Sequence, residues 1–329
     1  MSHILEVRGL QVAFAGERGN TIGTDRIDFF VDQGETVCLV GESGCGKSIT
    51  SLAVMGLLGR GGRVSQGEIL FNGRNLLKMD RKELDQVRGK ELSMIFQDPL
   101  SSLNPVLTIG KQLEEGLKAH TELGKEERRK RALDLLGRAG IREAEAVMKK
   151  YPHQLSGGMR QRVMIAMALS CQPSLLIADE PTTALDVTIQ AQILELLKEL
   201  KDKIHMGIVF ITHDLGVVSD ICDSISVMYA GTIVESGSSD QIFYEPRHPY
   251  TWGLLASVPK IDTDEHQRLI PIEGNPVDLI NPPKGCPFAP RCKHCMKICI
   301  DQAPPQCQVG EGHMAACWLP VKEAREEEE

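Results

Sequence analysis

The chain has 329 residues, of which 42% are hydrophobic and 25% are charged, and its net charge is -8. This composition is typical of a folded globular protein and excludes a chain that is disordered throughout. The negative charge argues against a surface that follows nucleic-acid phosphates, so we expect no nucleic-acid partner. Because no stretch reaches the roughly 20 apolar residues that cross a bilayer, we expect a cytoplasmic chain that docks onto other membrane subunits.

The first part of the chain predicts strands around a glycine-rich junction. An apolar run over residues 36–40 predicts a buried strand, and residues 47–58 predict a helix. Farther on, residues 68–71 alternate toward Asn72-Gly73, a dipeptide typical of hairpin turns. These elements predict an antiparallel β subdomain beside the core.

The junction at residues 41–48 matches the phosphate-binding pattern G-x-x-x-x-G-K-[ST] at every fixed position. Glycines let backbone N–H groups point at phosphate oxygens, and the following helix adds the positive end of its dipole. Lys47 brings a cation to the outer phosphates, Ser48 offers a hydroxyl to Mg²⁺, and Cys45 contributes its backbone N–H rather than a redox-sensing thiol. The alternative is an ordinary glycine-rich turn. The predicted nucleotide-binding residues here are Gly41, Glu42, Ser43, Gly44, Cys45, Gly46, Lys47, Ser48 and Ile49.

The middle of the chain predicts a helical subdomain over about residues 98–170, followed by an apolar strand from residue 175 that ends in Asp179 and Glu180. Beside a phosphate loop, Asp179 is expected to hold the Mg²⁺ shell and Glu180 to act as the general base on the attacking water. The alternative is a turn with two solvated carboxylates.

Strands and helices alternate again beyond this point, which predicts an α/β core with a largely parallel sheet. Residues 189–200 carry an apolar helical face, and residues 208–212 predict another buried strand. After Gly237 the chain becomes rich in proline and cysteine, so we place a boundary near residue 240. The predicted domains are 1–240 and 241–329.

The segment Leu155-Ser-Gly-Gly-Met-Arg-Gln161 resembles the signature of ABC ATPases, and it follows a helical subdomain as in that family. Other family elements stand in order around it. Gln97 resembles the Q-loop glutamine, Ala184-Leu185-Asp186 the D-loop, His213 the switch histidine and Phe14 the aromatic residue that stacks on adenine.

The resemblance implies a P-loop NTPase fold of the ABC type that binds ATP and Mg²⁺. Two cassettes would close head to tail, so that ATP lies between Lys47 of one subunit and Ser156, Gly157 and Gly158 of the other. The implied catalytic residues are Glu180, His213, Gln97 and Lys47, with Ser48, Gln97 and Asp179 as Mg²⁺ ligands and Phe14 and Asp186 also at the nucleotide. Taken alone, His213 would be a strand-end histidine hydrogen-bonded in the core, and the alternative for Gln97 is a solvated loop glutamine.

The C-terminal part of the chain indicates which subgroup of ABC ATPases it resembles. Pro246-Arg-His-Pro-Tyr-Thr251 and Gly285-Cys-Pro-Phe-Ala-Pro-Arg-Cys292 resemble the ends of ATP-binding subunits of dipeptide, oligopeptide and nickel importers. That family carries an iron-sulfur (4Fe-4S) cluster in this region, which the resemblance assigns to Cys286, Cys292, Cys299 and Cys317. Four thiolates suit Zn²⁺ equally well, Cys295 and Cys307 are extra thiols, and free thiols without a metal are a further alternative.

The sequence therefore predicts a D-type ATPase subunit on the cytoplasmic side of the membrane that energises import of dipeptides or oligopeptides. The implied partners are a second ABC ATPase subunit, two membrane permeases and an extracytoplasmic peptide-binding protein. One alternative is the same ATPase with nickel or another solute as cargo. The other is a soluble ABC ATPase that acts on nucleic acid, which the absence of a long heptad run in the sequence disfavours.

Overall fold

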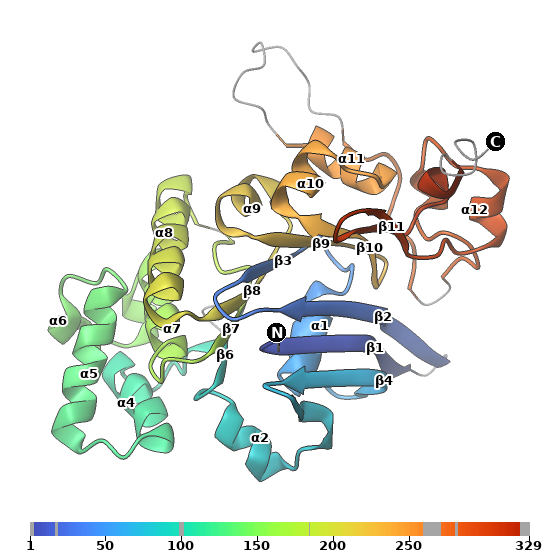
Figure 1. Ribbon diagram of the computed structural model, residues 1–329. Coiled ribbons are helices and arrows are strands. Elements are labelled where there is room, and N and C mark those ends of the chain that lie inside the picture. The colour runs from blue at the N-terminus through green and yellow to red at the C-terminus, as the bar shows by residue number, and fades with distance from the viewer. Residues whose placement is uncertain are drawn as a thin grey trace. The chain divides into compact units, whose positions relative to one another are not determined.

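The computed structural model describes residues 3–16, 19–98, 102–183, 185–258, 271–279 and 282–322. The chain forms two compact units, each assembled from separate stretches of sequence. Figure 1 labels their helices and strands. The first unit comprises Met1–Leu5, Val31–Glu35 and Phe71–Phe210, and the second comprises Glu6–Phe30, Thr36–Leu70 and Ile211–Glu329.

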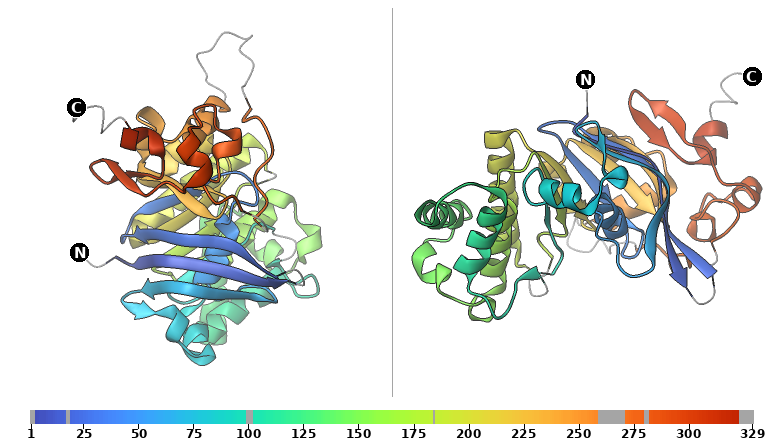
Figure 2. Two further views of the ribbon diagram at one scale, coloured as in Figure 1. Left: turned by 90° about the vertical axis from the view of Figure 1, so that its right-hand side faces the viewer. Right: turned by 90° about the horizontal axis from the view of Figure 1, so that it is seen from below.

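Two sheets form the second unit. Within this unit, the strands of one sheet follow the order β2-β1-β4 and run side by side in Figure 2. The strands of the other sheet that belong to this unit follow the order β3-β9-β10-β12-β11, in which β3 and β9 are parallel and the remaining pairs are antiparallel. The strands are β1 (Leu5–Gly16), β2 (Gly19–Val31), β3 (Thr36–Val40), β4 (Gly62–Phe71), β9 (Ser224–Tyr229), β10 (Thr232–Ser238), β11 (Cys307–Gly310) and β12 (His313–Ala315).

The helices of this unit are short. α1 follows β3 directly, as the sequence predicts for a phosphate loop. The predicted helix over residues 47–58 ends earlier, at Val54, because Gly56 turns left-handed with φ of +60° and stops it. The helices are α1 (Lys47–Val54), α9 (Leu215–Ile221), α10 (Ser239–Tyr244), α11 (Pro249–Ala256) and α12 (Lys297–Asp301), with a 3-10 turn at Ala289–Arg291.

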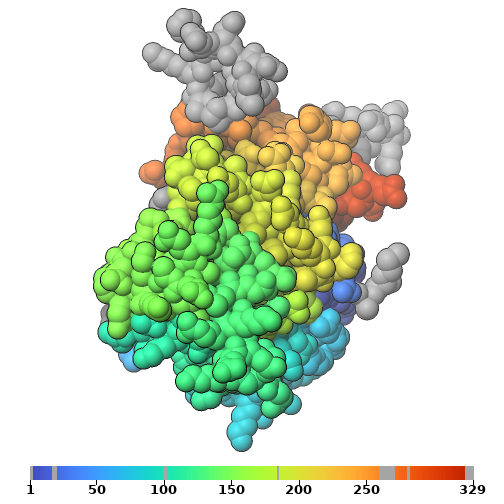
Figure 3. Space-filling view, turned by 90° about the vertical axis from the view of Figure 1, so that its left-hand side faces the viewer, coloured from blue at the N-terminus to red at the C-terminus, as the bar shows by residue number. Residues whose placement is uncertain are grey.

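Helices dominate the first unit. Their outer surface appears in green in Figure 3. Two buried strands, β6 (Leu92–Ile95) and β7 (Leu175–Asp179), pair in parallel, and β8 (Gly207–Thr212) follows at the end of the unit. The other elements are β5 (Arg74–Asn75), α2 (Arg81–Val87), α4 (Ile109–His120), α5 (Lys125–Arg138), α6 (Ala144–Met148), α7 (Gly157–Ala168) and α8 (Val187–Ile204), with 3-10 turns at Leu76–Lys78 and Pro152–Gln154.

The C-terminal residues join the sheet of the second unit through a buried carboxylate. Glu235 on β10 is fully buried and lies opposite Ala315 of β12. Its carboxylate accepts hydrogen bonds from the backbone N–H groups of Arg247, at 2.6 Å, and His248, at 3.0 Å, and lies 2.8 Å from Nε2 of His313. A boundary at residue 240 thus falls inside α10, within a unit that continues to the C-terminal residues.

In the described ranges, no helix combines the length and the apolar character needed to cross a bilayer. The longest of these helices, α8, has 18 residues and carries lysines in its last turn.

The buried Glu235 carboxylate should account for much of the attachment of the C-terminal residues. In Glu235→Gln an amide NH₂ replaces one acceptor oxygen and faces a donor, so we expect the free energy of unfolding to fall by about 3 kcal/mol. Urea titration followed by circular dichroism measures this loss. The exposed Glu311→Gln serves as the control, and a loss below about 0.5 kcal/mol for Glu235→Gln would contradict this account.

Candidate functional site

The phosphate loop runs from Gly41 to Gly46 between β3 and α1, and two of its glycines are required by their surroundings. Gly41 has a φ of +154°, and a Cβ there would lie 2.2 Å from the carbonyl oxygen of Met228. Gly46 caps α1 with a φ of +105°, and its Cβ would lie 2.9 Å from the carbonyl oxygen of Gly23. The loop is therefore fitted against β9 and β2 without room for side chains at these positions.

The Lys47 side chain stabilises the loop through hydrogen bonds to its backbone. Its side chain is 5% exposed, and Nζ donates hydrogen bonds to the carbonyl oxygens of Gly41, at 2.7 Å, and Glu42, at 3.0 Å. An ammonium held at the first residue of α1, with the helix N-terminus beside it, forms a positive anion-binding concavity. This geometry suits the phosphates of a nucleotide, as the sequence predicts.

The Cys45 side chain is buried in this loop, and its thiol has no predicted chemical role. Burial raises the pKa of its thiol, although Nζ of Lys47 at 3.7 Å from the sulfur lowers it. A reactive, redox-sensing cysteine needs a depressed pKa and access to solvent, and Cys45 is buried. The sequence interpretation of Cys45 as a backbone donor fits this environment.

Phe14 and Ile49, predicted to contact the nucleotide, lie near one glycine. A Cβ on Gly23 would be 2.9 Å from both the Phe14 ring and Cδ1 of Ile49, and one on Gly62 would be 2.8 Å from the Phe14 ring. The ring is partly buried between these two glycines. Stacking of Phe14 on adenine stays a prediction.

His213 follows the last residue of β8 and precedes α9. Its side chain is exposed, so the alternative interpretation as a core histidine is wrong. The next residue, Asp214, starts α9 by accepting a hydrogen bond from the N–H of Gly216 at 2.8 Å. His213 thus stands at a strand-to-helix turn, a position suited to sensing a ligand.

The carboxylates predicted for catalysis end β7 in the first unit. Asp179 is 4% exposed, and Glu180 adopts a left-handed conformation with a φ of +46°. Oε2 of Glu180 accepts hydrogen bonds of 2.9 Å from Nε2 of Gln97 and from the hydroxyl of Thr183. The structure thus brings Gln97 and Glu180 together, and two donors orient the carboxylate. Strained backbone at such a residue is common in active sites.

The signature segment begins α7. Ser156 is exposed and caps the helix, with its hydroxyl accepting a 3.4 Å hydrogen bond from the N–H of Met159. A Cβ on Gly158 would lie 3.2 Å from the side chain of Ile189 on α8. Asp186 caps α8 by accepting from the N–H of Ile189 at 2.9 Å, so the signature and D-loop segments adjoin. Gly157 is exposed at the same helix end, and Ala184 lies outside the described residues.

Four cysteines line one small cavity in the second unit, together with Phe288. They are the four predicted ligands, Cys286, Cys292, Cys299 and Cys317. Burial raises the pKa of Cys286 to about 11 and that of Cys317 to about 12. Cys295 is exposed, and neither it nor Cys307 lines the cavity.

No metal-binding group is preformed there. Across the residues that the structure describes, no three His, Cys, Asp or Glu side chains are grouped closely enough to hold a metal ion. The metal site predicted from the sequence therefore stays a prediction.

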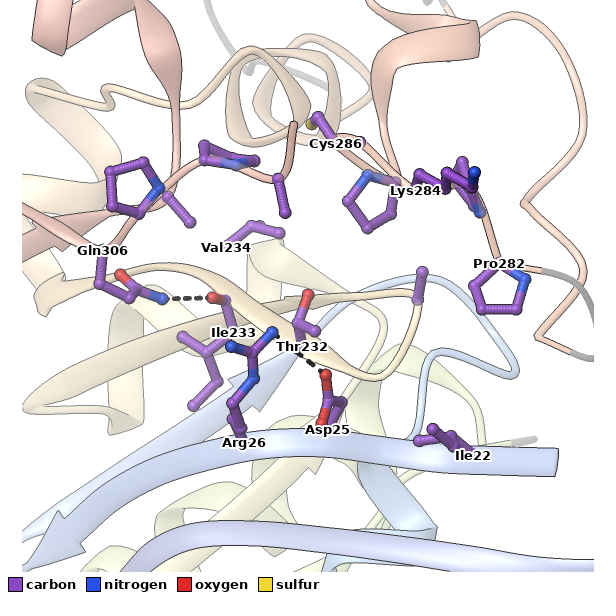
Figure 4. Close-up of a pocket in the computed structure, with 18 of the residues that line it drawn as sticks. Ile22, Asp25, Arg26, Thr232, Ile233, Val234, Pro282, Lys284, Cys286 and Gln306 are labelled. Atoms are coloured by element: carbon purple, nitrogen blue, oxygen red, sulfur yellow. Dashed lines mark hydrogen bonds and ion pairs between the residues drawn. The ribbon is translucent and has the colours of Figure 1, made fainter. Parts of the chain in front are cut away.

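A second cavity, of about 430 Å³, is lined by residues outside the phosphate loop, and Figure 4 shows this lining. Proline-rich segments form one wall, and β2 and β10 form the other. An ion pair of 3.3 Å between Arg26 and Asp25 and a hydrogen bond of 2.6 Å from Gln306 to the carbonyl of Ile233 border it. Among the predicted site residues, only Cys286 contributes to its lining.

Three residues that form hydrogen bonds with predicted site residues were not predicted from the sequence. Thr183 binds Glu180, whereas Tyr250 and Arg291 bind Glu42 of the phosphate loop. Tyr250 and Arg291 belong to the two C-terminal motifs that carry the family resemblance, but their partner lies some 200 positions away in the sequence. No local pattern indicates such a pairing.

Comparisons with known proteins show the family of the chain. The family model described as ABC transporter matches residues 24–183, and the one described as Oligopeptide/dipeptide transporter, C-terminal region, matches residues 234–299. The chain is 52% identical to the oligopeptide transport ATP-binding protein OppD of Bacillus subtilis (strain 168), over 97% of this chain and 89% of that protein. It is 51% identical to OppD of Salmonella typhimurium, over 97% of this chain and 95% of that protein.

A solved structure extends the likeness to the fold. The dimeric structure of an ATP-binding cassette in a post-hydrolysis state, bound to ADP and phosphate, superimposes with a TM-score of 0.66 at 29% identity. The match covers 71% of this chain and 98% of that one. The ABC ATPase fold is thereby shown for the greater part of the chain.

Substitution of Gly41 tests whether the fitted loop binds nucleotide. In Gly41→Ala the new methyl group meets the Met228 carbonyl, so the loop must shift, and strain of roughly 1–3 kcal/mol predicts about 5- to 150-fold weaker Mg-ATP binding. Titration with a fluorescent ATP analogue measures it. Gly59→Ala is the matched control, since a Cβ there meets no atom within 4 Å, and equal affinities of the two variants would contradict the assignment.

Proposed function

The chain belongs to the ATP-binding subunits of ABC peptide transporters, and from this premise we propose that it hydrolyses ATP to drive import of dipeptides and oligopeptides through membrane permeases. The observation that carries the proposal is the match over nearly the whole length to peptide-transport subunits, including the C-terminal region typical of them. The phosphate loop and the oriented Glu180 supply the chemistry that the function needs.

ATP binds through its phosphates at the phosphate loop. Backbone N–H groups of residues 41–48 and the ammonium of Lys47 neutralise the phosphate charge, and the loop is too closely fitted to collapse when the nucleotide leaves. The donor set also fits Mg²⁺, which prefers hard oxygen ligands, since Ser48 offers a hydroxyl and Asp179 a buried carboxylate. When bound, Mg²⁺ offsets the negative charge that develops on the phosphates.

Glu180 acts as the general base. Its carboxylate accepts a proton from the attacking water, and the hydrogen bonds from Gln97 and Thr183 hold the carboxylate in position for this transfer. Orientation of this kind lowers the barrier because the reacting groups are positioned in advance. The family resemblance also assigns Gln97 as a Mg²⁺ ligand.

Closure of two cassettes completes the site. The exposed start of α7, with Ser156 and Gly157, presents a helix N-terminus to a partner, as a second anion-binding surface for the same nucleotide. The likeness to a cassette solved as a dimer with ADP and phosphate supports a head-to-tail pair. His213 then senses the γ-phosphate in the closed state.

The proposed assembly contains a second ABC ATPase subunit, two membrane permeases and an extracytoplasmic peptide-binding protein. It places this chain on the cytoplasmic face of the membrane, where ATP is present. The relatives named as oligopeptide and dipeptide transport ATP-binding proteins support this assembly.

We further propose that Cys286, Cys292, Cys299 and Cys317 hold an iron-sulfur cluster. All four line one cavity, which fits four-thiolate ligation. Four thiolates suit a zinc ion as well, so the choice of an iron-sulfur cluster rests on the resemblance of this segment to the C-terminal region of peptide-importer subunits. When bound, the cluster would link the ends of a segment poor in core residues.

Glu180→Gln tests the catalytic assignment. The amide cannot accept the proton, so we expect turnover in the assembled transporter to fall at least about 100-fold while Mg-ATP binding persists. Phosphate release and nucleotide binding are measured on the same preparation. Glu195→Gln, which changes an exposed carboxylate on α8, is the matched control and should leave turnover unchanged. Undiminished phosphate release by Glu180→Gln would refute the general-base role.

Elemental analysis tests the cysteine assignment. Anaerobically purified protein should contain iron and acid-labile sulfide, and Cys292→Ser or Cys317→Ser should lower both because each removes one ligand. Cys307→Ser, which lies outside the cavity lining, is the matched control and should leave the iron content unchanged. Protein with neither iron nor zinc would rule out a metal centre.

A further inference from the structure

The second residue of the phosphate loop, Glu42, is held at each of its polar groups. Its carbonyl oxygen accepts from Nζ of Lys47 at 3.0 Å, and its N–H donates to the phenol oxygen of Tyr250 at 2.9 Å. Its carboxylate accepts two hydrogen bonds from Arg291, of 2.5 and 3.0 Å. Two of these three side-chain partners therefore come from the C-terminal region, more than 200 residues away in the sequence.

The Arg291 side chain is buried, and all its hydrogen-bond donors are used in and around this contact. Its side chain is 3% exposed, and the guanidinium uses all five N–H donors that an arginine possesses. Two of them reach Glu42, and the others reach the carbonyls of Ile272, at 3.1 Å, and Glu273, at 3.0 Å, and the hydroxyl of Tyr229, at 3.5 Å. Glu42 supplies the only carboxylate among these acceptors, so it is the charge partner of a buried cation.

The cysteine-rich segment fixes the position of Arg291. Arg291 ends a 3-10 turn that begins at Ala289, whose N–H donates to the carbonyl of Cys286 at 3.0 Å. Cys286 in turn donates from its N–H to the carbonyl of Cys299 at 2.7 Å. The ring of Phe288 lies 5.3 Å from that of Tyr250, so the same segment also supports the second group that holds Glu42.

We propose that Arg291 is a positioning residue for the phosphate loop, which makes the ATP affinity of the loop depend on the folded state of residues 285–299. Arg291 and Tyr250 together fix the Glu42 peptide, and this directs its carbonyl toward Lys47. If the segment loosens, Glu42 loses two of its three side-chain partners and Lys47 loses a fixed acceptor. The inference rests on the proposed binding of ATP at this loop.

Coupling of this kind is reciprocal. A segment that strengthens ATP binding must itself be stabilised by ATP to the same degree, because both effects belong to one thermodynamic cycle. Nucleotide should therefore slow the opening of residues 285–299, although none of these residues touches the phosphates in the proposed site. A purely structural arginine would not produce that effect.

The first test is a double-mutant cycle on the assembled transporter. Arg291→Gln and Glu42→Gln should each raise the Kd of Mg-ATP and the KM about tenfold, with kcat changed less than about twofold. The double variant should be no weaker than either single variant, because both remove one interaction. Arg291→Lys, which keeps the charge but loses the paired contact, should fall in between.

Lys293→Gln is the matched control, because Lys293 is 70% exposed and pairs with Glu273 at 3.8 Å. It should leave Kd unchanged. Wild-type affinity in Arg291→Gln and Glu42→Gln, or additive losses in the double variant, would overturn the proposal. Should the Arg291 variants fail to fold, Glu42→Gln alone decides the outcome, since it leaves Arg291 its carbonyl acceptors.

The second test is hydrogen exchange of residues 285–299 with and without Mg²⁺ and a non-hydrolysable ATP analogue. The analogue should slow exchange about tenfold in the wild type and in Lys293→Gln, and have no effect in Glu42→Gln. Protection that survives in Glu42→Gln would overturn the coupling. Failure of the wild type to bind any nucleotide would instead contradict the proposed function, so the two failures are distinct.

Discussion

The contact between the Lys47 ammonium and the carbonyls of Gly41 and Glu42 is the interaction on which the rest of the site depends. It exists only because Gly41 has no side chain where the Met228 carbonyl approaches, so the backbone can curl back over the start of α1. A loop held in this form presents its N–H groups and one buried cation to an anion without rearrangement. Nucleotide binding thus follows from steric fit as much as from charge.

The same loop is also held from outside, by residues that the fold recruits from the C-terminal region. Glu235 attaches this region to β10 through buried hydrogen bonds, and Arg291 and Tyr250 reach Glu42 from the structure so attached. The C-terminal residues are therefore part of the unit that contains the phosphate loop, not a loosely appended tail. Through these contacts, the folded state of the proposed iron-sulfur segment can change the affinity of the loop for ATP.

Local patterns in the sequence predicted the phosphate loop, the helical region and β7 with its two carboxylates, because each depends on residues close together in the chain. The end of α1 was misplaced since Gly56 breaks a pattern that hydrophobic spacing alone would extend. Pairings such as Arg291 with Glu42 and His313 with Glu235 could not be predicted, because they depend on which distant segments the fold brings together. For Glu180 the sequence predicted the catalytic role but not the hydrogen bond that its carboxylate accepts from Thr183.

The central claim is that one ATP is shared between the phosphate loop of one cassette and the signature segment of another. Photolabelling tests this most directly, using an ATP analogue with a photoreactive group on the γ-phosphate and mass spectrometry of the assembled transporter. The account predicts label on the segment from Leu155 to Gln161 as well as on residues 41–48. Label confined to residues 41–48 under conditions where nucleotide is bound and hydrolysed would contradict it.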